Sequence, residues 1–203
     1  MTLDAASPAG DLFGARPLPE GLTYRSGVLA PARQAALLAR IDACAWRDDL
    51  RRRVQHHGWR YDYRARRVSR DDRIGPLPGW LEPEAVGLAE AGWFARPPDQ
   101  AIVNEYRPGQ GIAAHVDCEP CFGEVVACLS LGSPCVMEFR EVGSSGRASI
   151  VLEPGSLLVL SGPARYGWTH AIAARKSDVM DGVRRRRARR VSVTFRTVTP
   201  SGG

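Results

Sequence analysis

The sequence predicts an α+β fold, mainly β, in a single domain. The chain has 203 residues, 44% of them hydrophobic, which is enough for one sizeable core. Two segments with helical spacing of apolar residues occur before residue 100, and from Ala101 onward short β-prone runs alternate with turn residues. Several short strands at close spacing are typical of a two-sheet β-sandwich or barrel.

The elements are expected in the following order. Residues 1–20 are rich in Ala, Gly and Pro and should form a loose N-terminal lead-in. A helix is predicted from Pro31 to Trp46, with Pro in its first turn and its apolar residues on one face, and a second helix over roughly 84–93. Strands are predicted at 101–106, 125–131, 136–140, 149–152, 157–161, 169–173 and 191–198, with turns at 143–146 and 153–155.

The segment from Asn104 to Asp117 carries the most informative pattern. A predicted strand runs into a Pro-Gly turn, and His115 and Asp117 follow two residues apart, so that in an extended chain both side chains point to the same side. With the distant His170 they make a set of two His and one carboxylate, which holds Fe(II) on one face and leaves other positions open. The His-x-Asp pair taken alone is more often a satisfied surface pair.

Four motifs occur in an order that resembles the AlkB family of Fe(II)/2-oxoglutarate dioxygenases. They are Asn104-x-Tyr106, His115-x-Asp117, His170 and Arg190-x5-Arg196. The resemblance covers about residues 53–198. It implies a double-stranded β-helix (jelly roll) as the catalytic core at 101–198, preceded within 21–100 by N-terminal helices and a nucleotide-recognition lid, with 21–198 as a single domain.

The resemblance also implies a role for each motif residue. Fe(II), 2-oxoglutarate and O₂ would be the cofactor and co-substrates of an oxidoreductase. Arg190 would bind the far carboxylate of 2-oxoglutarate, because a planar guanidinium suits two carboxylate oxygens. Arg196 matches a second family arginine near Asp117 and the substrate. His115, Asp117 and His170 would bind the iron, and Asn104 and Tyr106 would be hydrogen-bonding partners of 2-oxoglutarate.

Residues 184–190 include six arginines, so the spacing must show which of them would bind 2-oxoglutarate. Only Arg190 begins a strand-like alternation and stands six residues before Arg196. Even spacing places these two side chains on the same strand face. The other five arginines of the run are expected to face solvent or phosphates.

Positive charge is concentrated in two segments. Residues 51–73 contain nine arginines and three aspartates, and residues 175–190 contain seven arginines, one lysine and two aspartates, a net of +6 each. The whole chain is also +6, so the remainder carries −6. Two basic segments on an otherwise acidic protein indicate a nucleic-acid partner, with Trp59 and Tyr61 able to stack on bases. The alternative is a solvated surface in an arginine-rich chain.

Two functions on nucleic acid are consistent with these motifs. The first is repair: oxidative demethylation or dealkylation of N-alkylated bases in DNA or RNA, with Glu119 reading a base edge that carries an amino group or a positive charge. The alternative is tRNA modification, by hydroxylation of a wobble-uridine side chain, because the stretch from Val54 to Arg196 is most similar to that branch of the family. Protein demethylation is less favoured because of the basic segments. A binding module without catalysis is the least favoured, because every motif residue is present.

The remaining expectations concern the cysteines and the location of the protein. The chain has five cysteines and no apparent export signal, so reduced, mostly buried thiols are expected, with a zinc site at Cys118, Cys121, Cys128 and Cys135 as the weaker alternative. No stretch has the ~20 apolar residues of a membrane helix. We expect a cytoplasmic monomer without a membrane contact.

Overall fold

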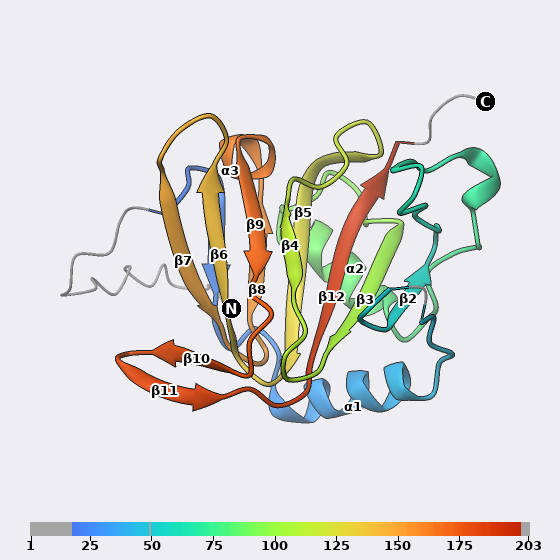
Figure 1. Cartoon of the computed structure of the whole chain (residues 1–203). Coiled ribbons are helices and arrows are strands. Elements are labelled where there is room, and N and C mark those ends of the chain that lie inside the picture. The colour runs from blue at the N-terminus through green and yellow to red at the C-terminus, as the bar shows by residue number, and fades with distance from the viewer. Residues whose placement is uncertain (1–17, 49, 200–203) are drawn as a thin grey trace.

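Two antiparallel sheets face each other in the computed structural model, which describes residues 18–48 and 50–199 (Figure 1). The larger sheet has the strand order β1-β8-β5-β12-β3-β2 and the smaller one β4-β9-β6-β7. Most of the predicted lead-in 1–20 lies outside the described residues. The strands of the two sheets are β1 (Leu22–Arg25), β2 (Val54–His57), β3 (Gln100–Tyr106), β4 (Ile112–His115), β5 (Phe122–Gly132), β6 (Cys135–Glu141), β7 (Arg147–Leu152), β8 (Leu157–Leu160), β9 (Trp168–Ile172) and β12 (Arg190–Val198).

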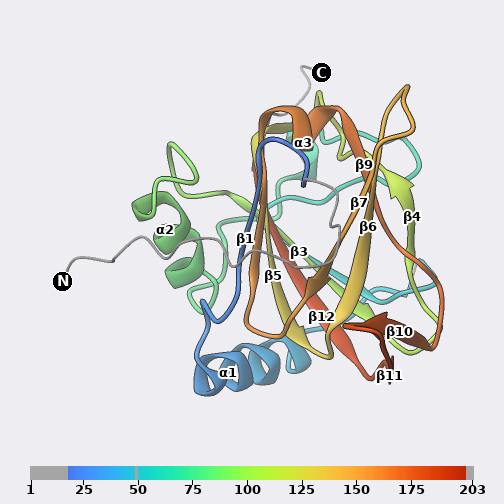
Figure 2. The ribbon, with the colours of Figure 1, turned by 90° about the vertical axis from the view of Figure 1, so that its left-hand side faces the viewer.

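Helices α1 (Pro31–Asp42) and α2 (Glu82–Glu90) pack on the outer face of the larger sheet (Figure 2). Both are shorter at their C-terminal end than the sequence suggested. In α2 the reason is Gly92, whose φ of +79° is a conformation that ends helices and that glycine adopts without strain. A short helix α3 (Gly162–Tyr166) and a 3-10 turn η1 (Arg70–Asp72) complete the helical elements of the described residues.

Strand β12 lies between β5 and β3 at the centre of the larger sheet and separates two cores. Its odd-numbered residues Val191, Val193 and Phe195 pack with the two helices, and all three are fully buried. Its even-numbered residues face the space between the sheets, because side chains alternate along a strand. This alternation explains why Arg190 and Arg196, which stand six residues apart, point into the same space.

A two-stranded ribbon, which the sequence did not predict, precedes β12. Strands β10 (Ser177–Met180) and β11 (Val183–Arg186) pair in antiparallel register as a separate sheet. A run of arginines has no apolar alternation, so the pattern gave no signal for β11. Tertiary contacts of the neighbouring Asp178 hold the ribbon in place instead.

Asp178 anchors the base of the ribbon. Its side chain is fully buried and binds Arg187 through both oxygens, at 2.6 and 2.8 Å, and Arg175 at 2.5 Å. It also accepts the backbone N–H of Val136 at 3.2 Å. The expectation that all five other arginines of the run face solvent is therefore wrong for Arg187. It is also wrong for Arg189, which pairs with Glu105 and Asp42. Both arginines bind acids that are distant in sequence, and local spacing cannot reveal such partners.

Replacing Asp178 with Asn should lower the free energy of unfolding by about 3 kcal/mol, because Arg187 would remain buried without its counter-charge. Urea unfolding monitored by circular dichroism measures this. Asp181→Asn is the matched control, since Asp181 is exposed at the tip of the ribbon and Asn tolerates its φ of +52°. An equal loss in both variants, or no loss in either, would contradict the role of Asp178 as an anchor.

The cysteines depart from expectation in one place. Cys118 and Cys121 are joined by a disulfide, so the prediction of reduced thiols is wrong for this pair. The turn that connects them, in which the N–H of Cys121 donates to the carbonyl of Cys118 at 3.3 Å, brings their Cα atoms to 5.3 Å. Cys128 and Cys135 are free and buried between the sheets, as buried thiols were expected to be. With one pair already oxidised, the four-cysteine zinc alternative does not apply.

No helix in residues 18–48 and 50–199 is long and apolar enough to cross a membrane.

Candidate active site

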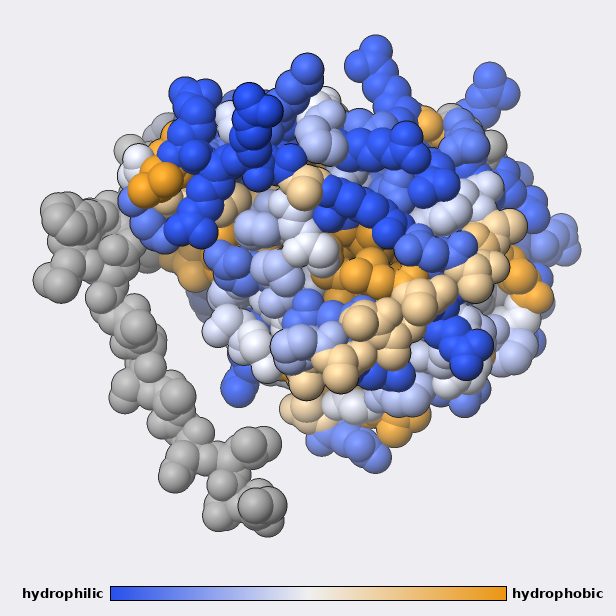
Figure 3. Space-filling view, turned by 90° about the horizontal axis from the view of Figure 1, so that it is seen from below, coloured by the Kyte–Doolittle hydropathy of each residue, from blue (hydrophilic) through white to orange (hydrophobic). Residues whose placement is uncertain are grey.

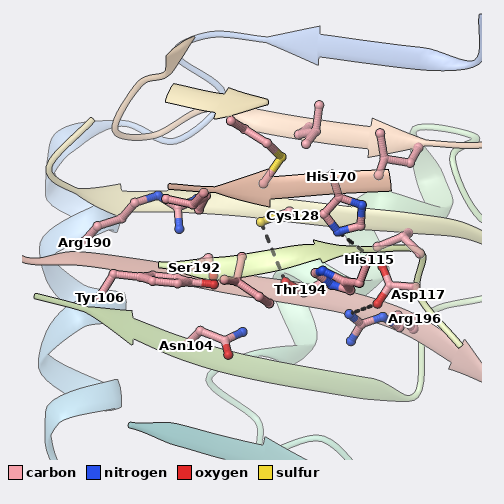
Figure 4. A pocket seen from close by; sticks show the side chains of 16 residues that line it. Asn104, Tyr106, His115, Asp117, Cys128, His170, Arg190, Ser192, Thr194 and Arg196 are labelled. Atoms are coloured by element: carbon pink, nitrogen blue, oxygen red, sulfur yellow. Dashed lines mark hydrogen bonds and ion pairs between the residues drawn. The ribbon is translucent and has the colours of Figure 1, made fainter. Parts of the chain in front are cut away.

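A pocket between the two sheets collects the motif residues from strands far apart in the sequence (Figure 4). Its floor is the inner face of the larger sheet, and β4 and β9 supply the opposite wall. In Figure 4, Arg190 and Tyr106 lie at the left end and the two histidines, Asp117 and Arg196 gather at the right. The lining residues are Asn104, Tyr106, Ile112, His115, Asp117, Val126, Cys128, Met137, Leu158, Leu160, His170, Ile172, Arg190, Ser192, Thr194 and Arg196.

The two histidines face each other across β4 and β9. His115 and His170 are directly opposed in the register of these strands, and their ring centroids are 4.4 Å apart. Asp117 lies two residues beyond the end of β4, with its Oδ2 3.9 Å from Nε2 of His170. Nδ1 of His115 lies 2.8 Å from the carbonyl of Ala113, a contact in which the ring nitrogen must donate. This tautomer leaves Nε2 of His115 with a free lone pair, as metal ligation requires.

The protonation states at this end suit a metal site. Burial lowers the pKa of His170 to about 4, so the imidazole is neutral near pH 7. Burial alone would raise the pKa of Asp117, but Arg196 and the nearby histidines outweigh it and hold this pKa well below its ordinary value. Neutral imidazoles and an ionised carboxylate are the forms that bind divalent iron.

Arg196 binds one carboxylate oxygen of Asp117. Its Nη2 donates to Oδ1 of Asp117 at 2.6 Å, and both side chains are buried. Within the described ranges, no three His, Cys, Asp or Glu side chains as placed converge closely enough to hold a metal ion. Oδ2 of Asp117 nevertheless lies on the side of His170, so the three donors of the motif share one end of the pocket. The chemistry of this donor set fits Fe(II).

Arg165, which the sequence reading did not single out, supports the same loop from behind. It is 2% exposed and donates to the carbonyls of Asp117 at 2.9 Å and Cys118 at 3.3 Å. A guanidinium buried against backbone carbonyls fixes the position of the chain that carries Asp117. The only signal in the sequence was its place in the stretch Arg165 to His170, where charge alone does not distinguish a buried arginine from an exposed one.

Arg190 at the other end of the pocket has unused hydrogen-bond donors. It is 3% exposed, and its Nη2 donates to Ser130 at 3.1 Å. Its Nε and Nη1 are buried without a partner. A buried charge with unpaired donors is costly, and a carboxylate entering the pocket would satisfy it. The residues present therefore fit the far carboxylate of 2-oxoglutarate.

Tyr106 and Asn104 on β3, which lie opposite Arg190 and Ser192, line the same pocket. Tyr106 is the partner of Arg190 in the register, and the guanidinium carbon of Arg190 lies 5.3 Å from the centre of the Tyr106 ring. Asn104 accepts a hydrogen bond from Nε of Arg52 at 2.8 Å through Oδ1. Ser192, opposite Asn104, lines the same floor. Arg52 belongs to the basic segment 51–73, and the sequence did not distinguish it from the other arginines there.

The three predicted substrate contacts lie beside the pocket, outside its lining. Trp59 and Tyr61 pack against a small cluster that contains Cys118, Cys121 and Phe122. Tyr61 is close enough to Arg196 and Asp117 for both charges to act on its pKa, which burial raises. Glu119 is exposed in the turn between the two bridged cysteines. The segment that carries Trp59 and Tyr61 thus packs against the loop that follows Asp117.

Tyr63 is closer to the pocket than the sequence suggested. Its ring lies 5.0 Å from that of Tyr61 and 5.6 Å from that of His56, centre to centre. Burial raises its pKa, while the charges of Arg52 and Arg196 act in the opposite direction. Tyr63 is therefore near the pocket residue Arg196 and in contact with Tyr61. The sequence offered Tyr63 only as one of three aromatics in a basic segment.

Three comparisons with known proteins concern the family and the fold of the chain. The family model of the 2OG-Fe(II) oxygenase superfamily matches residues 22–196. The chain is 38% identical over 201 residues to an "Alkylated DNA repair protein ALKBH8 homolog" of Arabidopsis thaliana, covering 88% of this chain and 58% of that protein. It is 34% identical over 211 residues to a "tRNA (carboxymethyluridine(34)-5-O)-methyltransferase ALKBH8" of Macaca fascicularis, covering 89% of this chain and 31% of that protein.

Among solved structures, OsALKBH1 superposes with a TM-score of 0.64 at 20% identity, covering 91% of this chain and all of that one. This likeness concerns the fold, which is the jelly roll that the motifs implied. The chain spans between about a third and three fifths of the length of the two ALKBH8 relatives.

Proposed function

The chain belongs to the AlkB family of the 2OG-Fe(II) oxygenase superfamily, and we propose that it hydroxylates a modified uridine in tRNA. Enzymes of this superfamily use Fe(II), 2-oxoglutarate and O₂. Bound together, these groups supply the oxidation: 2-oxoglutarate becomes succinate and CO₂, one oxygen atom enters the succinate and the other the substrate C–H bond.

The protein's own residues would bind and orient the reactants. His115, Asp117 and His170 would hold the iron, with Arg196 binding the carboxylate of Asp117 and Arg165 binding its backbone carbonyl. Arg190 would bind the far carboxylate of 2-oxoglutarate with its unpaired donors. The apolar residues between the two ends, such as Met137, Leu158 and Leu160, exclude water from the space that separates them.

The charge of the pocket is the observation that favours a uridine. The 16 lining residues include two arginines and one carboxylate, and Arg196 already neutralises that carboxylate. Bound Fe(II) and the 2-oxoglutarate dianion would cancel each other, so the pocket would keep the net charge of +1 of its arginines and carboxylate. A cationic base such as 1-methyladenine would meet like charge here, whereas a uracil offers acceptor oxygens, and a carboxymethyl substituent adds a negative charge.

The relatives support the same substrate class. One of them is named for methylating carboxymethyluridine at position 34 of tRNA. The chain matches 31% of that protein and has the oxygenase fold, so it corresponds to a part other than the methyltransferase. An oxygenase that acts on the same uridine is the simplest reason for the two to occur in one chain.

Repair of alkylated bases is the second candidate, and Glu119 is the observation that favours it. This exposed carboxylate lies two residues beyond Asp117, close enough to Arg165 for their charges to interact. A carboxylate at the entrance could accept hydrogen bonds from an amino group or a cationic base. The relative from Arabidopsis is also named an alkylated DNA repair protein.

The two candidates can be separated with three RNA stem-loops that differ at one loop position: carboxymethyluridine, 1-methyladenine or the unmodified base. With Fe(II) and 2-oxoglutarate, we expect the uridine nucleoside to gain one oxygen atom by mass spectrometry and the 1-methyladenine to keep its methyl group. Demethylation of the adenine with the uridine unchanged would establish repair in its place.

Glu119→Gln should leave hydroxylation of the uridine within about twofold of the parent, because rim charges contribute little to affinity. Glu124→Gln is the matched control, an exposed glutamate at the start of β5. A selective loss in Glu119→Gln on 1-methyladenine would assign the acid to reading an alkylated base.

A further inference from the structure

The arginines of the second basic segment divide into two groups. Arg175, Arg187 and Arg189 are bound to acids, and Arg190 points into the pocket. Arg184, Arg185 and Arg186 are exposed on β11, and no acidic partner is found for them among the described residues. The segment therefore presents three guanidinium groups without an acidic partner on one short strand, and Arg184 donates only to Oγ of Ser177, at 3.4 Å.

The ribbon holds these groups in a defined arrangement. In the register of β10 and β11, Val179 lies opposite Arg184 and Ser177 opposite Arg186. Cross-strand partners share a face, so Arg184 and Arg186 project together from the face on which Val179 is 57% exposed. Arg185 projects from the other face, opposite Asp178. Because Asp178 is locked to Arg187 and Arg175, the ribbon does not depend on a partner for its shape.

The ribbon lies at the opposite end of the β-structure from the iron ligands. It leads directly into Arg190, at the start of β12, whereas Arg196, six residues further along this strand, contacts Asp117. Six residues of strand span ~20 Å. Figure 1 shows the ribbon below the two sheets. Figure 3, which looks at this end, shows long hydrophilic side chains standing out from the surface at the upper left, where the ribbon lies.

We propose that the β10–β11 ribbon is a second docking site for the nucleic acid, which binds phosphates through Arg184 and Arg186 at a distance from the reacting base. The identity of the polyanion rests on the proposed function. The forked guanidinium suits phosphate oxygens, and the apolar side chain of Val179, opposite Arg184 on the same face, can pack against the sugar backbone. A base at the iron and a phosphate at the ribbon cannot belong to adjacent nucleotides, so the ribbon selects a long or folded substrate.

The test compares two double variants that change the charge equally. In Arg184→Glu/Arg186→Glu the ribbon is reversed; in Arg25→Glu/Arg40→Glu, two exposed arginines outside both basic segments are reversed. Fluorescence anisotropy with Fe(II)-free protein measures the dissociation constants of a full-length tRNA transcript and of a pentanucleotide, over a range of salt concentrations. No turnover is needed, so failure of the proposed reaction does not affect the result.

We expect the ribbon variant to bind tRNA at least about tenfold more weakly, with the slope of log K against log salt reduced by about 2, and to bind the pentanucleotide as the parent does. The control should stay within about twofold for both ligands. Equal weakening in the two variants would show that only overall charge matters and would overturn the proposal. Equal weakening for tRNA and pentanucleotide would place the site next to the base instead and would also overturn it.

A competition experiment distinguishes a nucleic-acid partner of the ribbon from an acidic protein partner. Polyglutamate of the same total charge should displace tRNA from the parent protein much less effectively than unlabelled tRNA does. If polyglutamate competes equally well, and the ribbon variant loses both ligands to the same extent, the ribbon is a docking site for acidic protein and the assignment to nucleic acid is wrong. Thermal unfolding of the ribbon variant should match the parent, because the replaced side chains are exposed. The same measurement checks the fold of the control, in which Arg25 loses its contact with the Trp93 ring, 5.6 Å from the guanidinium carbon.

Discussion

Asp117→Ala should lower 2-oxoglutarate turnover at least about 100-fold, more than is usual for loss of a residue that only supports a metal ligand. Asp117 is the single carboxylate among the pocket-lining residues and the only anionic member of the proposed ligand set. Removing it leaves two neutral imidazoles, which bind divalent iron weakly. Succinate release with Fe(II) supplied anaerobically measures the effect.

The stability of the Asp117→Ala variant must be measured together with its turnover, because this replacement leaves Arg196 buried without its counter-charge. We therefore expect Asp117→Ala to lower the midpoint of thermal unfolding as well. Asp117→Asn is the control, since an amide can still accept a hydrogen bond from Arg196 but is a poor ligand for Fe(II). If Asp117→Asn keeps the thermal midpoint and loses turnover, the carboxylate acts on the metal. Full turnover in either variant would contradict the assignment of the iron site.

Arg190→Met should raise the KM for 2-oxoglutarate by about 100-fold, with a smaller effect on kcat at saturation. Two hydrogen bonds to a charged group contribute about 3 kcal/mol, and each 1.4 kcal/mol corresponds to a factor of ten. The long apolar side chain of Met fills most of the space of the arginine stem. Arg190→Lys should give an intermediate value, because it retains the charge and loses the fork.

Arg186→Ala is the matched control for the position of the co-substrate arginine within the run. It lies four residues earlier, exposed on the ribbon, and should leave the KM for 2-oxoglutarate unchanged. A large increase in this KM in Arg186→Ala, with none in Arg190→Met, would show that the wrong arginine has been assigned.

The sequence predicted the part of the fold in which side-chain alternation is strong. The seven predicted strands correspond to β3, β5 to β9 and β12, and the pattern of β12 gave both its buried apolar face and the shared direction of Arg190 and Arg196. The turns at 143–146 and 153–155 also lie between strands as expected. Alternation of this kind is a local property, so the sequence alone carries it.

Contacts between residues far apart in the sequence could not be predicted from such local patterns. Strand β4 has only four residues, and its place beside β9 depends on the pairing of His115 with His170. The burial of Arg165 and Arg187 depends on carbonyl and carboxylate groups that the fold brings to them. The disulfide between Cys118 and Cys121 depends on a local turn, whereas the odd number of cysteines favoured reduced thiols. Composition does not show which of many arginines are structural.

The most direct test of the central claim is to measure succinate and hydroxylated nucleoside in the same reaction, with a carboxymethyluridine stem-loop as substrate. We expect both products to form in equal amounts and to require Fe(II) and 2-oxoglutarate, and we expect Asp117→Asn to form neither. Absence of succinate from the iron-loaded parent protein would contradict the oxygenase assignment. Succinate formed without any hydroxylated uridine would contradict the proposed substrate.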